Sequence, residues 1–338
     1  MRKLTVSLIV FLMVSIALTE ANRVNAHANP ADKNEPYVVK NRLLLESAKI
    51  ADKGMEAAKN MLIRAFSENI TEADVVRAIN DAMTDEGSSE YVEAFGVIVA
   101  SGEQSAMPHG DTSDDGTNLI LPGEVVVVDL GARYRGYCSD LTRTFFMGNA
   151  TQEMMDIYNI TLEAQVAGIE AVRAGVWARD VDKVARDIIS GYGYGDNFTH
   201  GLGHGIGLYI HMPPILSPNS DGILFKSGDM TITIEPGIYL DGRFGIRIED
   251  DVFVLRTGYE LLTFYPKGIE NAILYPDTIS NDSQSTGEEN EEAVGENGLL
   301  GVLGEIFSNG VVIIICSVAV VMIVGLVVRK RKNREKEG

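Results

Sequence analysis

Apolar residues recur at helical spacing in two pairs of segments, and each pair is followed by stretches with strand spacing. In the first pair, apolar positions three and four residues apart predict an amphipathic helix over residues 39–66 and a second over residues 71–87. In the second pair, the same spacing predicts helices over residues 151–175 and 180–191. Gly175 stands where a glycine commonly ends a helix.

The strand patterns fall directly after each helix pair. Residues 95–100 and 125–130 follow the first pair, and residues 230–235 and 246–255 follow the second. The order helix, helix, strands therefore occurs twice. It predicts a pseudo-symmetric α+β body with a central sheet over residues 36–276.

The two ends of the chain have the composition of targeting segments. Residues 1–28 begin with basic residues, continue with an apolar stretch and end with small residues, which predicts a signal peptide. Residues 311–328 contain no charged residue, and the basic tail 329–338 follows, which predicts a transmembrane helix. The acidic, polar residues 277–298 are expected to form a disordered stalk. We therefore expect a single-pass protein of the cell membrane, with its body outside the cytoplasm and its C-terminus inside.

Composition excludes one class of partner. The chain of 338 residues has a formal net charge of −19 and a pI near 4.7, whereas proteins that bind nucleic acids need a basic surface. The chain has two cysteines, Cys138 and Cys316. Because Cys316 lies in the predicted membrane segment, the body has no partner for an internal disulfide.

Two carboxylates lie close together in the sequence around a predicted turn. Asp129 ends the apolar stretch 125–128, and Asp140 follows the turn on the returning strand. In a hairpin the two would converge, and a divalent cation would remove their repulsion. For this pair alone, an exposed hairpin with solvated acids is the more economical interpretation.

The histidines shift that balance toward a metal site. The chain has five, and three of them, His200, His204 and His211, lie within one glycine-rich stretch. A fourth is His109, in a separate glycine-containing loop. A single histidine is more often a core residue, but a cluster of this scarce residue type favours a functional site.

Two further acids follow strand patterns at positions that face inward. Glu235 and Glu249 occupy places where the alternating isoleucines would point to the core, and burying an unpaired carboxylate there is costly. Four carboxylates and one imidazole suit hard or borderline divalent ions, Mn²⁺ above all, with Co²⁺, Zn²⁺ and Fe²⁺ as alternatives. Two ions about 3.5–4 Å apart would balance the four charges and hold a bridging hydroxide. The predicted set is Asp129, Asp140, His204, Glu235 and Glu249.

These motifs, in this order, resemble one known family. Residues 129–144, 200–204, 235–237 and 247–250 are similar to the creatinase/methionine aminopeptidase superfamily, the pita-bread metallopeptidases. Residues 136–144 resemble its proline-peptidase branch, which includes Xaa-Pro aminopeptidase and prolidase. The resemblance implies a pseudo-two-fold repeat of helices around a curved, antiparallel central sheet.

The resemblance also implies a role for each predicted metal ligand. Asp129 would hold one metal ion, and His204 and Glu235 would hold the other. Asp140 and Glu249 would bridge the two ions. Glu235 would also act as the general base toward the bridging water.

The remaining site residues follow from the same resemblance. His109 and His211 would contact the substrate and the developing oxyanion. Arg247 is a candidate for positioning the substrate, with a structural ion pair as an equal alternative. His200 matches no ligand position and is expected to be structural. Where the family often has an acidic residue after the second substrate-contacting histidine, this chain has Met212.

The implied activity is hydrolysis of the N-terminal peptide bond of peptides, with Xaa-Pro peptides as the expected substrates of an aminopeptidase or a dipeptidase-like hydrolase. The large N-terminal domain typical of proline peptidases is absent from the sequence, so we expect a monomer with a more open site. Two alternatives stay open: a methionine-aminopeptidase-like activity of broader specificity, and a catalytically silent module that binds peptides.

Overall fold

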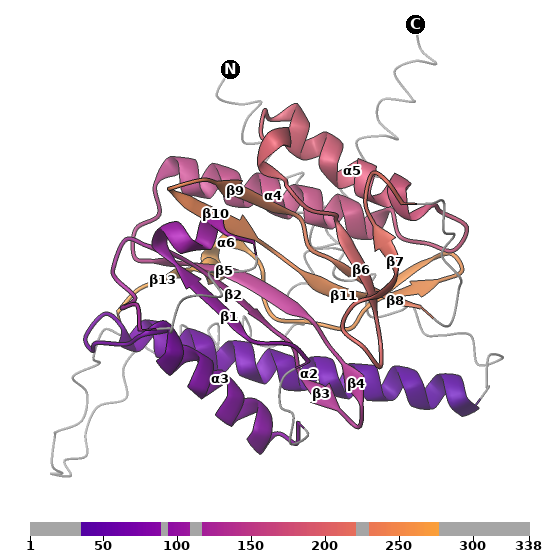
Figure 1. Ribbon diagram of the computed structural model, residues 1–338, viewed down its shortest axis with the longest axis horizontal. Coiled ribbons are helices and arrows are strands. Elements are labelled where there is room, and N and C mark those ends of the chain that lie inside the picture. The colour runs from indigo at the N-terminus through magenta and orange to yellow at the C-terminus, as the bar shows by residue number, and fades with distance from the viewer. Residues whose placement is uncertain (1–34, 89–93, 109–116, 221–229, 277–338) are drawn as a thin grey trace, which may run out of the picture. The chain divides into compact units, whose positions relative to one another are not determined.

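The computed structural model describes residues 35–88, 94–108, 117–220 and 230–276 (Figure 1). These residues form two layers of helices with β-strands between them. The signal peptide, stalk, membrane helix and basic tail predicted for residues 1–28, 277–298, 311–328 and 329–338 all lie outside the described residues.

The first helix pair covers one face of the strands. Helices α2 (Glu35–Arg64) and α3 (Glu72–Asp85) pack against each other and share one hydrophobic core with strand residues such as Val126 and Val128. Thr71 caps α3 through a reciprocal pair of hydrogen bonds, because its hydroxyl accepts the N–H of Asp74 while the Asp74 carboxylate accepts the N–H of Thr71.

The sheet beside this pair has four strands in the order β1-β2-β5-β13. They are β1 (Ile98–Ser101), β2 (Val125–Leu130), β5 (Leu141–Met147) and β13 (Ile273–Leu274). All six residues of β2 are buried, because the helix pairs cover both faces of the strand. That explains its uninterrupted apolar sequence, which differs from the alternation of a half-exposed strand.

The second helix pair, α4 (Gln152–Glu170) and α5 (Ala178–Gly191), lies on the opposite side (Figure 1). It packs on a second sheet with the order β12-β11-β8-β6-β7. The strands of this sheet are β6 (Gly203–Ile206), β7 (Met212–Leu216), β8 (Thr231–Ile234), β11 (Asp250–Leu255) and β12 (Gly258–Leu261). The predicted order of two helices followed by strands thus occurs twice, as expected.

The remaining elements are short. The β3 (Arg133–Tyr134) and β4 (Tyr137–Cys138) hairpin joins β2 to β5, and β9 (Gly237–Leu240) pairs with β10 (Phe244–Arg247). Single turns are formed by η1 (Gly102–Ala106), η2 (Gly195–Asn197) and α6 (Ile269–Ala272).

The two main sheets join where β5 meets the connection between β10 and β11. Glu249 donates its N–H to the carbonyl of Thr142 at 3.1 Å, and Arg247 donates its N–H to the Thr144 hydroxyl at 3.0 Å. This junction brings residues of the first strand group next to residues of the second.

Two predicted elements differ from the structure. Helix α4 ends at Glu170, before the predicted end at Gly175, because Ala174 donates its N–H to the carbonyl of Leu255 and so leaves the helical path. Gly175 instead has φ of 85° in the turn that follows. The single strand predicted over residues 246–255 is divided into β10 and β11, and the break lies at Ile248 and Glu249.

The predicted location in the cell membrane is corrected. Among the described residues, no helix combines the length and apolar character that crossing a bilayer requires. The segments from which the location was predicted lie outside the described residues.

Candidate metal centre and active site

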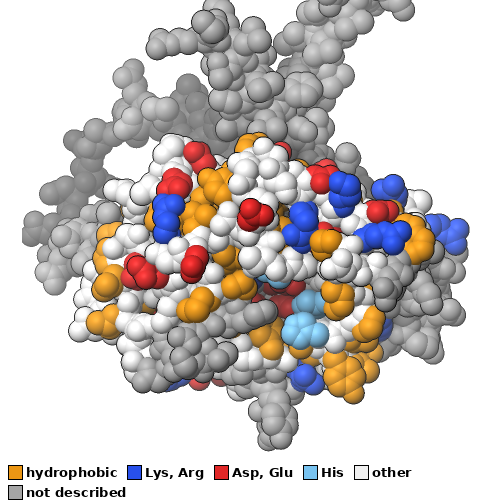
Figure 2. Space-filling view, turned by 45° about the horizontal axis from the view of Figure 1, so that its top comes forward, with side chains coloured by type: hydrophobic (Ala, Val, Ile, Leu, Met, Phe, Trp, Pro, Cys, Tyr) orange, Lys and Arg blue, Asp and Glu red, His pale blue; other side chains and the backbone are white. Residues whose placement is uncertain are grey.

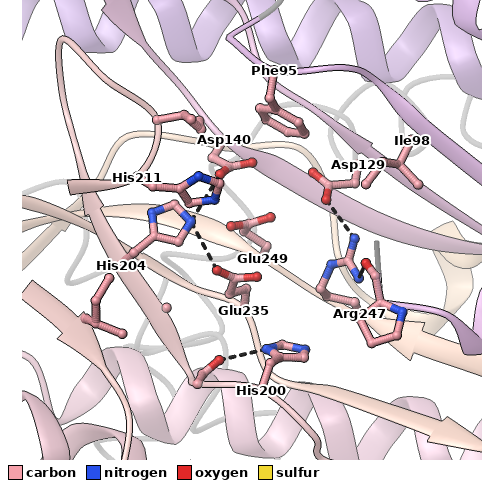
Figure 3. A pocket seen from close by; sticks show the side chains of 15 residues that line it. Phe95, Ile98, Asp129, Asp140, His200, His204, His211, Glu235, Arg247 and Glu249 are labelled. Carbon is pink, nitrogen blue, oxygen red and sulfur yellow. Dashed lines mark hydrogen bonds and ion pairs between the residues drawn. The ribbon is translucent and has the colours of Figure 1, made fainter. Parts of the chain in front are cut away.

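The predicted metal ligands converge at the junction of the two sheets (Figure 3). Asp129 lies in β2, and Asp140 directly precedes β5. His204 comes from β6, and Glu235 follows β8. Glu249 lies at the break between β10 and β11. Since these elements belong to both halves of the fold, the site exists only when the halves pack together.

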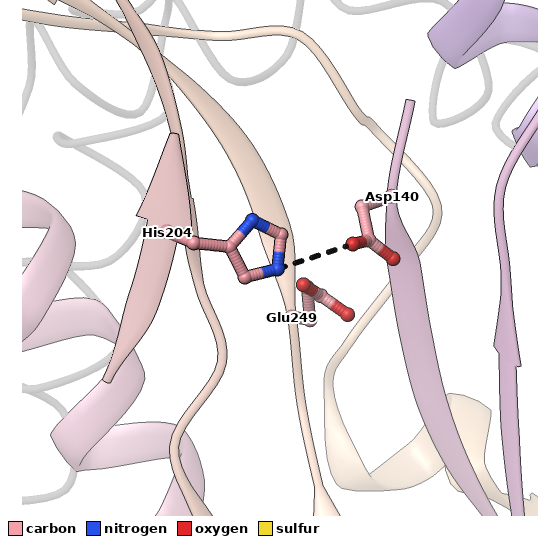
Figure 4. A group of neighbouring side chains, drawn as sticks. All are labelled: Asp140, His204 and Glu249. Atoms are coloured by element: carbon pink, nitrogen blue, oxygen red, sulfur yellow. Dashed lines mark ion pairs between the residues drawn. The ribbon is translucent and has the colours of Figure 1, made fainter. Parts of the chain in front are cut away.

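His204 lies at the centre of this group. Its Nε2 is 3.6 Å from Asp140 Oδ2 and 3.3 Å from Glu235 Oε1. Ligand atoms of Asp140, His204 and Glu249 all lie within 4.8 Å of one another, and all three residues are buried (Figure 4). One ion could therefore contact all three side chains after small adjustments.

Hydroxyl groups orient two of the carboxylates. Thr142 donates to Glu249 Oε2 at 2.6 Å, and Thr233 donates to Glu235 Oε1 at 3.1 Å. Thr233 and Glu235 are two residues apart, the spacing that places side chains on the same side of an extended chain. Asp251 accepts the backbone N–H of Asp140 at 3.0 Å. No pattern in the sequence singles out these three supporting residues.

Burial and mutual repulsion govern the protonation of the acids. Burial, with the neighbouring Glu249, Asp129 and Glu235, raises the pKa of Asp140 well above its usual range. Burial and the nearby Asp129 raise the pKa of Glu235 to about 8. Burial, Glu235 and Asp129 raise the pKa of Glu249 strongly. In the absence of a cation, this group holds protons that ordinary carboxyl groups release.

Burial lowers the pKa of His204 to about 4, with a smaller contribution in the same direction from His211. The imidazole is therefore neutral near pH 7, the form in which histidine binds metal ions. Its Nδ1 faces the carbonyl of Gly205 at 3.1 Å, which leaves Nε2 directed at the carboxylates.

The donor set fits divalent metal ions. Asp129 Oδ1 and Glu249 Oε1 are buried, and within the described residues neither has a hydrogen-bond partner. Buried polar atoms without partners are rare, and a missing ion is one of their standard explanations. Four carboxylates and one neutral imidazole in one place are what an oxygen-preferring divalent ion needs.

The Arg247 guanidinium donates four hydrogen bonds to other residues around the site. Its Nη2 donates to Asp129 Oδ2 at 2.7 Å, and its Nη1 donates to the Pro108 carbonyl and the Tyr239 hydroxyl at 2.8 and 2.9 Å. Its Nε donates to the Thr142 hydroxyl at 3.2 Å. Of the two roles predicted for Arg247, this geometry favours the structural ion pair.

His200, which we expected to be structural, lies in the wall of the same cavity (Figure 3). Its Nε2 lies 2.9 Å from the Tyr239 hydroxyl, which in turn accepts from Arg247. In the sequence, the position of His200 four residues before His204 indicates that it lies near the site. No sequence pattern indicates that Tyr239 connects His200 to Arg247.

His211 lies at the edge of the cavity with an exposed side chain. Its ring meets the His204 ring edge-on, with centroids 4.5 Å apart. His109, the other predicted contact for the substrate, lies outside the described residues.

Two side chains of helix α5 hold the beginning of the glycine-rich stretch through hydrogen bonds to its backbone. Arg186 donates to the carbonyls of Phe198 and His200 at 2.9 and 2.7 Å, and Asp182 accepts the N–H of Leu202 at 3.1 Å. Asp182 and Arg186 also pair with each other at 2.9 Å. The flexible backbone that brings His204 to the ligands is thereby held in one conformation.

The five predicted metal ligands line one cavity of about 280 Å³, together with His200, His211 and Arg247. Its walls combine the acids and histidines with apolar side chains, among them Phe95, Ile98, Ile210 and Ile215. In Figure 2, acidic and histidine side chains occupy a hollow in the surface, with hydrophobic side chains around it. Such a cavity can admit a peptide end and hold its first peptide bond beside the acids.

Comparison with known proteins agrees with this geometry. Residues 42–256 match the metallopeptidase family M24. A protein from Staphylococcus haemolyticus, described as an uncharacterized peptidase, is 45% identical over 70% of this chain and 63% of its own length.

Two solved structures illustrate the structural likeness. An Xaa-Pro dipeptidase from Bacillus anthracis is 40% identical with a TM-score of 0.63, over 70% of this chain and 63% of that one. An X-Pro aminopeptidase from Thermotoga maritima is 37% identical with a TM-score of 0.62, over 72% of this chain and 64% of that one. The expected pita-bread fold is thus confirmed, and this chain spans less than two thirds of the length of these proteins.

Proposed function

This chain belongs to the metallopeptidase family M24, and on that premise we propose that it is a metal-dependent aminopeptidase with a preference for Xaa-Pro peptides. The observation that carries the proposal is the buried group around His204 Nε2, with Asp140 at 3.6 Å and Glu235 at 3.3 Å. Two buried oxygens, Asp129 Oδ1 and Glu249 Oε1, have no hydrogen-bond partner among the described residues, and the pKa values of Asp140 and Glu249 are raised. Both features favour a site that binds cations over a module that has lost its metal site.

In this proposal, two divalent ions are held by five side chains. Asp129 would bind one ion, His204 and Glu235 would bind the other, and Asp140 and Glu249 would complete the ligand set. When bound, the ions supply Lewis acidity that activates water at neutral pH and polarises the substrate carbonyl. Mn²⁺ is the proposed occupant, because four of the five ligands are carboxylates.

The protein's own groups move protons and orient the substrate. The Glu235 carboxylate accepts a proton from the attacking water and returns it to the nitrogen of the broken peptide bond. The Thr233 hydroxyl keeps that carboxylate in place. His211, at the edge of the cavity, donates a hydrogen bond to the oxygen on which negative charge develops. The buried walls exclude bulk water and so strengthen these contacts.

Peptide hydrolysis by purified protein tests the proposal. With Mn²⁺ added, we expect release of free alanine from Ala-Pro-Ala, little release from Met-Ala-Ala, and loss of activity with a chelator. Cleavage of Met-Ala-Ala at an equal rate would replace the proline preference with a methionine-aminopeptidase-like specificity. Absence of cleavage with bound metal present would contradict the enzyme proposal as a whole.

A further inference from the structure

The ion pair on helix α5 lies outside the cavity. Asp182 and Arg186 are one helical turn apart, and the carboxylate accepts hydrogen bonds from Nε and Nη2 of the guanidinium, both at 2.9 Å. The side chain of Asp182 is 1% exposed and that of Arg186 is 22% exposed. Neither residue is among the described residues that line the cavity. Any effect of the pair on the site must therefore pass through other residues.

The pair holds the backbone that leads into β6. Arg186 donates to the carbonyls of Phe198 and His200 at 2.9 and 2.7 Å, and its guanidinium carbon lies 4.1 Å from the centroid of the Phe198 ring. Asp182 accepts the N–H of Leu202 at 3.1 Å. The planar fork of arginine suits such simultaneous contacts, whereas the compact ammonium of lysine does not. Three alternate residues before β6 are thus held from α5.

Leu202 connects this anchor to the two ligands proposed for one ion. Its carbonyl accepts the N–H of Glu235 at 2.8 Å, and His204 follows it two residues later in β6. The His204 N–H donates to the Thr233 hydroxyl, which in turn donates to Glu235 Oε1. One short segment therefore supports the backbone of Glu235 and carries the imidazole of His204 toward it (Figure 3).

The segment has few side chains of its own to hold it. A side chain at Gly203 would collide with the Thr233 carbonyl, and a Cβ at Gly201 would lie 2.6 Å from the Leu216 carbonyl. Glycine permits this close approach to β7 and β8, but it loses more conformational freedom on folding than any other residue. The hydrogen bonds from α5 therefore limit the conformations that this stretch can adopt.

The ligand proposed for the other ion is held by different elements. Asp129 lies in β2, which pairs with β5 along its whole length and with β1 on its other side. Its carboxylate accepts Arg247 Nη2 at 2.7 Å. These strands belong to the first half of the fold, whereas α5, β6 and β8 belong to the second. A change on α5 consequently reaches His204 and Glu235 more directly than it reaches Asp129.

We propose that the Asp182–Arg186 pair positions the ligands of one of the two proposed ions, the one held by His204 and Glu235, and so sets the affinity for that ion from outside the cavity. The inference rests on the proposed function and adds two positioning residues to it. The pair acts through the backbone of residues 198–204 and touches neither substrate nor metal.

Calorimetric titration of the metal-free chain with Mn²⁺ separates the two ions. His204→Ala and Asp129→Asn identify the binding step that belongs to each ion. Arg186→Met should weaken the step that His204→Ala abolishes by about tenfold or more, because residues that only support a metal ligand typically contribute about 10–100-fold to affinity. The step that Asp129→Asn abolishes should stay near its wild-type affinity.

Two further variants separate positioning from a general loss of stability. Arg186→Lys keeps the charge beside Asp182 without the planar fork, so it should weaken the same step to a smaller extent, and it carries the test if Arg186→Met does not fold. Lys183→Met removes a surface pair of the same helix and spacing, Lys183–Asp187, and should change neither step.

The outcomes distinguish this inference from the function on which it rests. Equal weakening of both steps, or unchanged binding in the Arg186 variants, would overturn the inference and leave the aminopeptidase proposal intact. Absence of Mn²⁺ binding to the wild-type chain would overturn both.

Discussion

Glu249 and Asp250 are neighbours in the chain and equally buried, each 1% exposed, yet their surroundings are opposite. The Asp250 carboxylate accepts hydrogen bonds from Arg143 Nη2 at 2.8 Å, from the Lys267 ammonium, and from the Gln165 amide at 2.8 Å. Burial alone would raise the pKa of Asp250, but Arg143 and Lys267 hold it well below its usual range.

Glu249 faces three other acids and has one identified hydrogen bond, from the Thr142 hydroxyl. Burial and the nearby Glu235 raise its pKa strongly. The comparison shows two ways to keep a carboxylate in a protein interior. At Asp250 the chain itself supplies the cations, whereas at Glu249 we propose that metal ions supply them. The first arrangement serves stability, and the second serves chemistry.

The largest effect is expected from removing the internal cation. Arg143→Met leaves the buried Asp250 with a weaker counter-charge and should lower the free energy of unfolding by about 3–5 kcal/mol. Urea denaturation followed by circular dichroism measures it. Arg77→Met is the matched control, because the Arg77–Asp74 pair lies on the surface and its loss should leave the unfolding midpoint almost unchanged. Equal effects of the two substitutions would contradict the contrast.

For Glu249 we expect the opposite outcome, a loss of activity without a loss of stability. Glu249→Gln should reduce peptide hydrolysis by at least about 100-fold. Mutation of residues that only hydrogen-bond to a metal ligand typically lowers metal affinity or activity by about 10–100-fold, and loss of a ligand itself should cost at least as much. The stability of the metal-free protein should be unchanged or higher, because one of several repelling acids is removed. Activity assays and denaturation of the same preparation measure both quantities.

Glu260→Gln, the same substitution at an exposed position of β12, should leave activity unchanged. Because burial raises the pKa of the Glu260 carboxyl, the substitution should not lower stability. A large loss of metal-free stability in Glu249→Gln would mean that Glu249, like Asp250, is a structural charge.

Asp52 of α2 is an intermediate case, since the contacts described for it are the backbone N–H groups of Phe264 and Tyr265. Burial raises its pKa to about 6, from an ordinary value near 3.8. Between these values the folded state retains a proton that the unfolded state has released, so its contribution to stability falls as pH rises.

Asp52→Asn should remove this slope. The difference in the free energy of unfolding between Asp52→Asn and wild type should grow in favour of the variant by about 1–3 kcal/mol from pH 4 to pH 7. Denaturation at several pH values measures it. A difference that stays constant with pH would show that Asp52 keeps an ordinary pKa.

Local spacing was sufficient to predict most of the fold. Apolar periodicity predicted both helix pairs, and the predicted start of the second helix at residue 71 coincides with the Thr71 cap of α3. The predicted end of α4 was wrong because the observed end depends on a tertiary hydrogen bond, from Ala174 to Leu255, that no local pattern contains. For the same reason the break at Glu249 could not be predicted, since it follows from the junction with β5.

The candidate site followed from residue types that are individually costly to bury. Asp129, His204, Glu235 and Glu249 stood out because they end or interrupt apolar or glycine-rich stretches. Asp140 stood out because it follows the turn after Asp129, and the structure brings all five to one cavity. Thr142, Thr233 and Asp251 did not stand out, because hydroxyls and acids at these positions fit any strand edge. Their roles appear only once the two sheets are joined.

Titration of the metal-free protein with Mn²⁺ by isothermal calorimetry tests the central claim most directly. We expect saturable binding of two ions per chain, and weaker binding or fewer ions in Glu249→Gln. Absence of saturable binding to the folded wild-type chain would contradict it, because the acids around His204 would then be stable without the cations on which the proposed function depends.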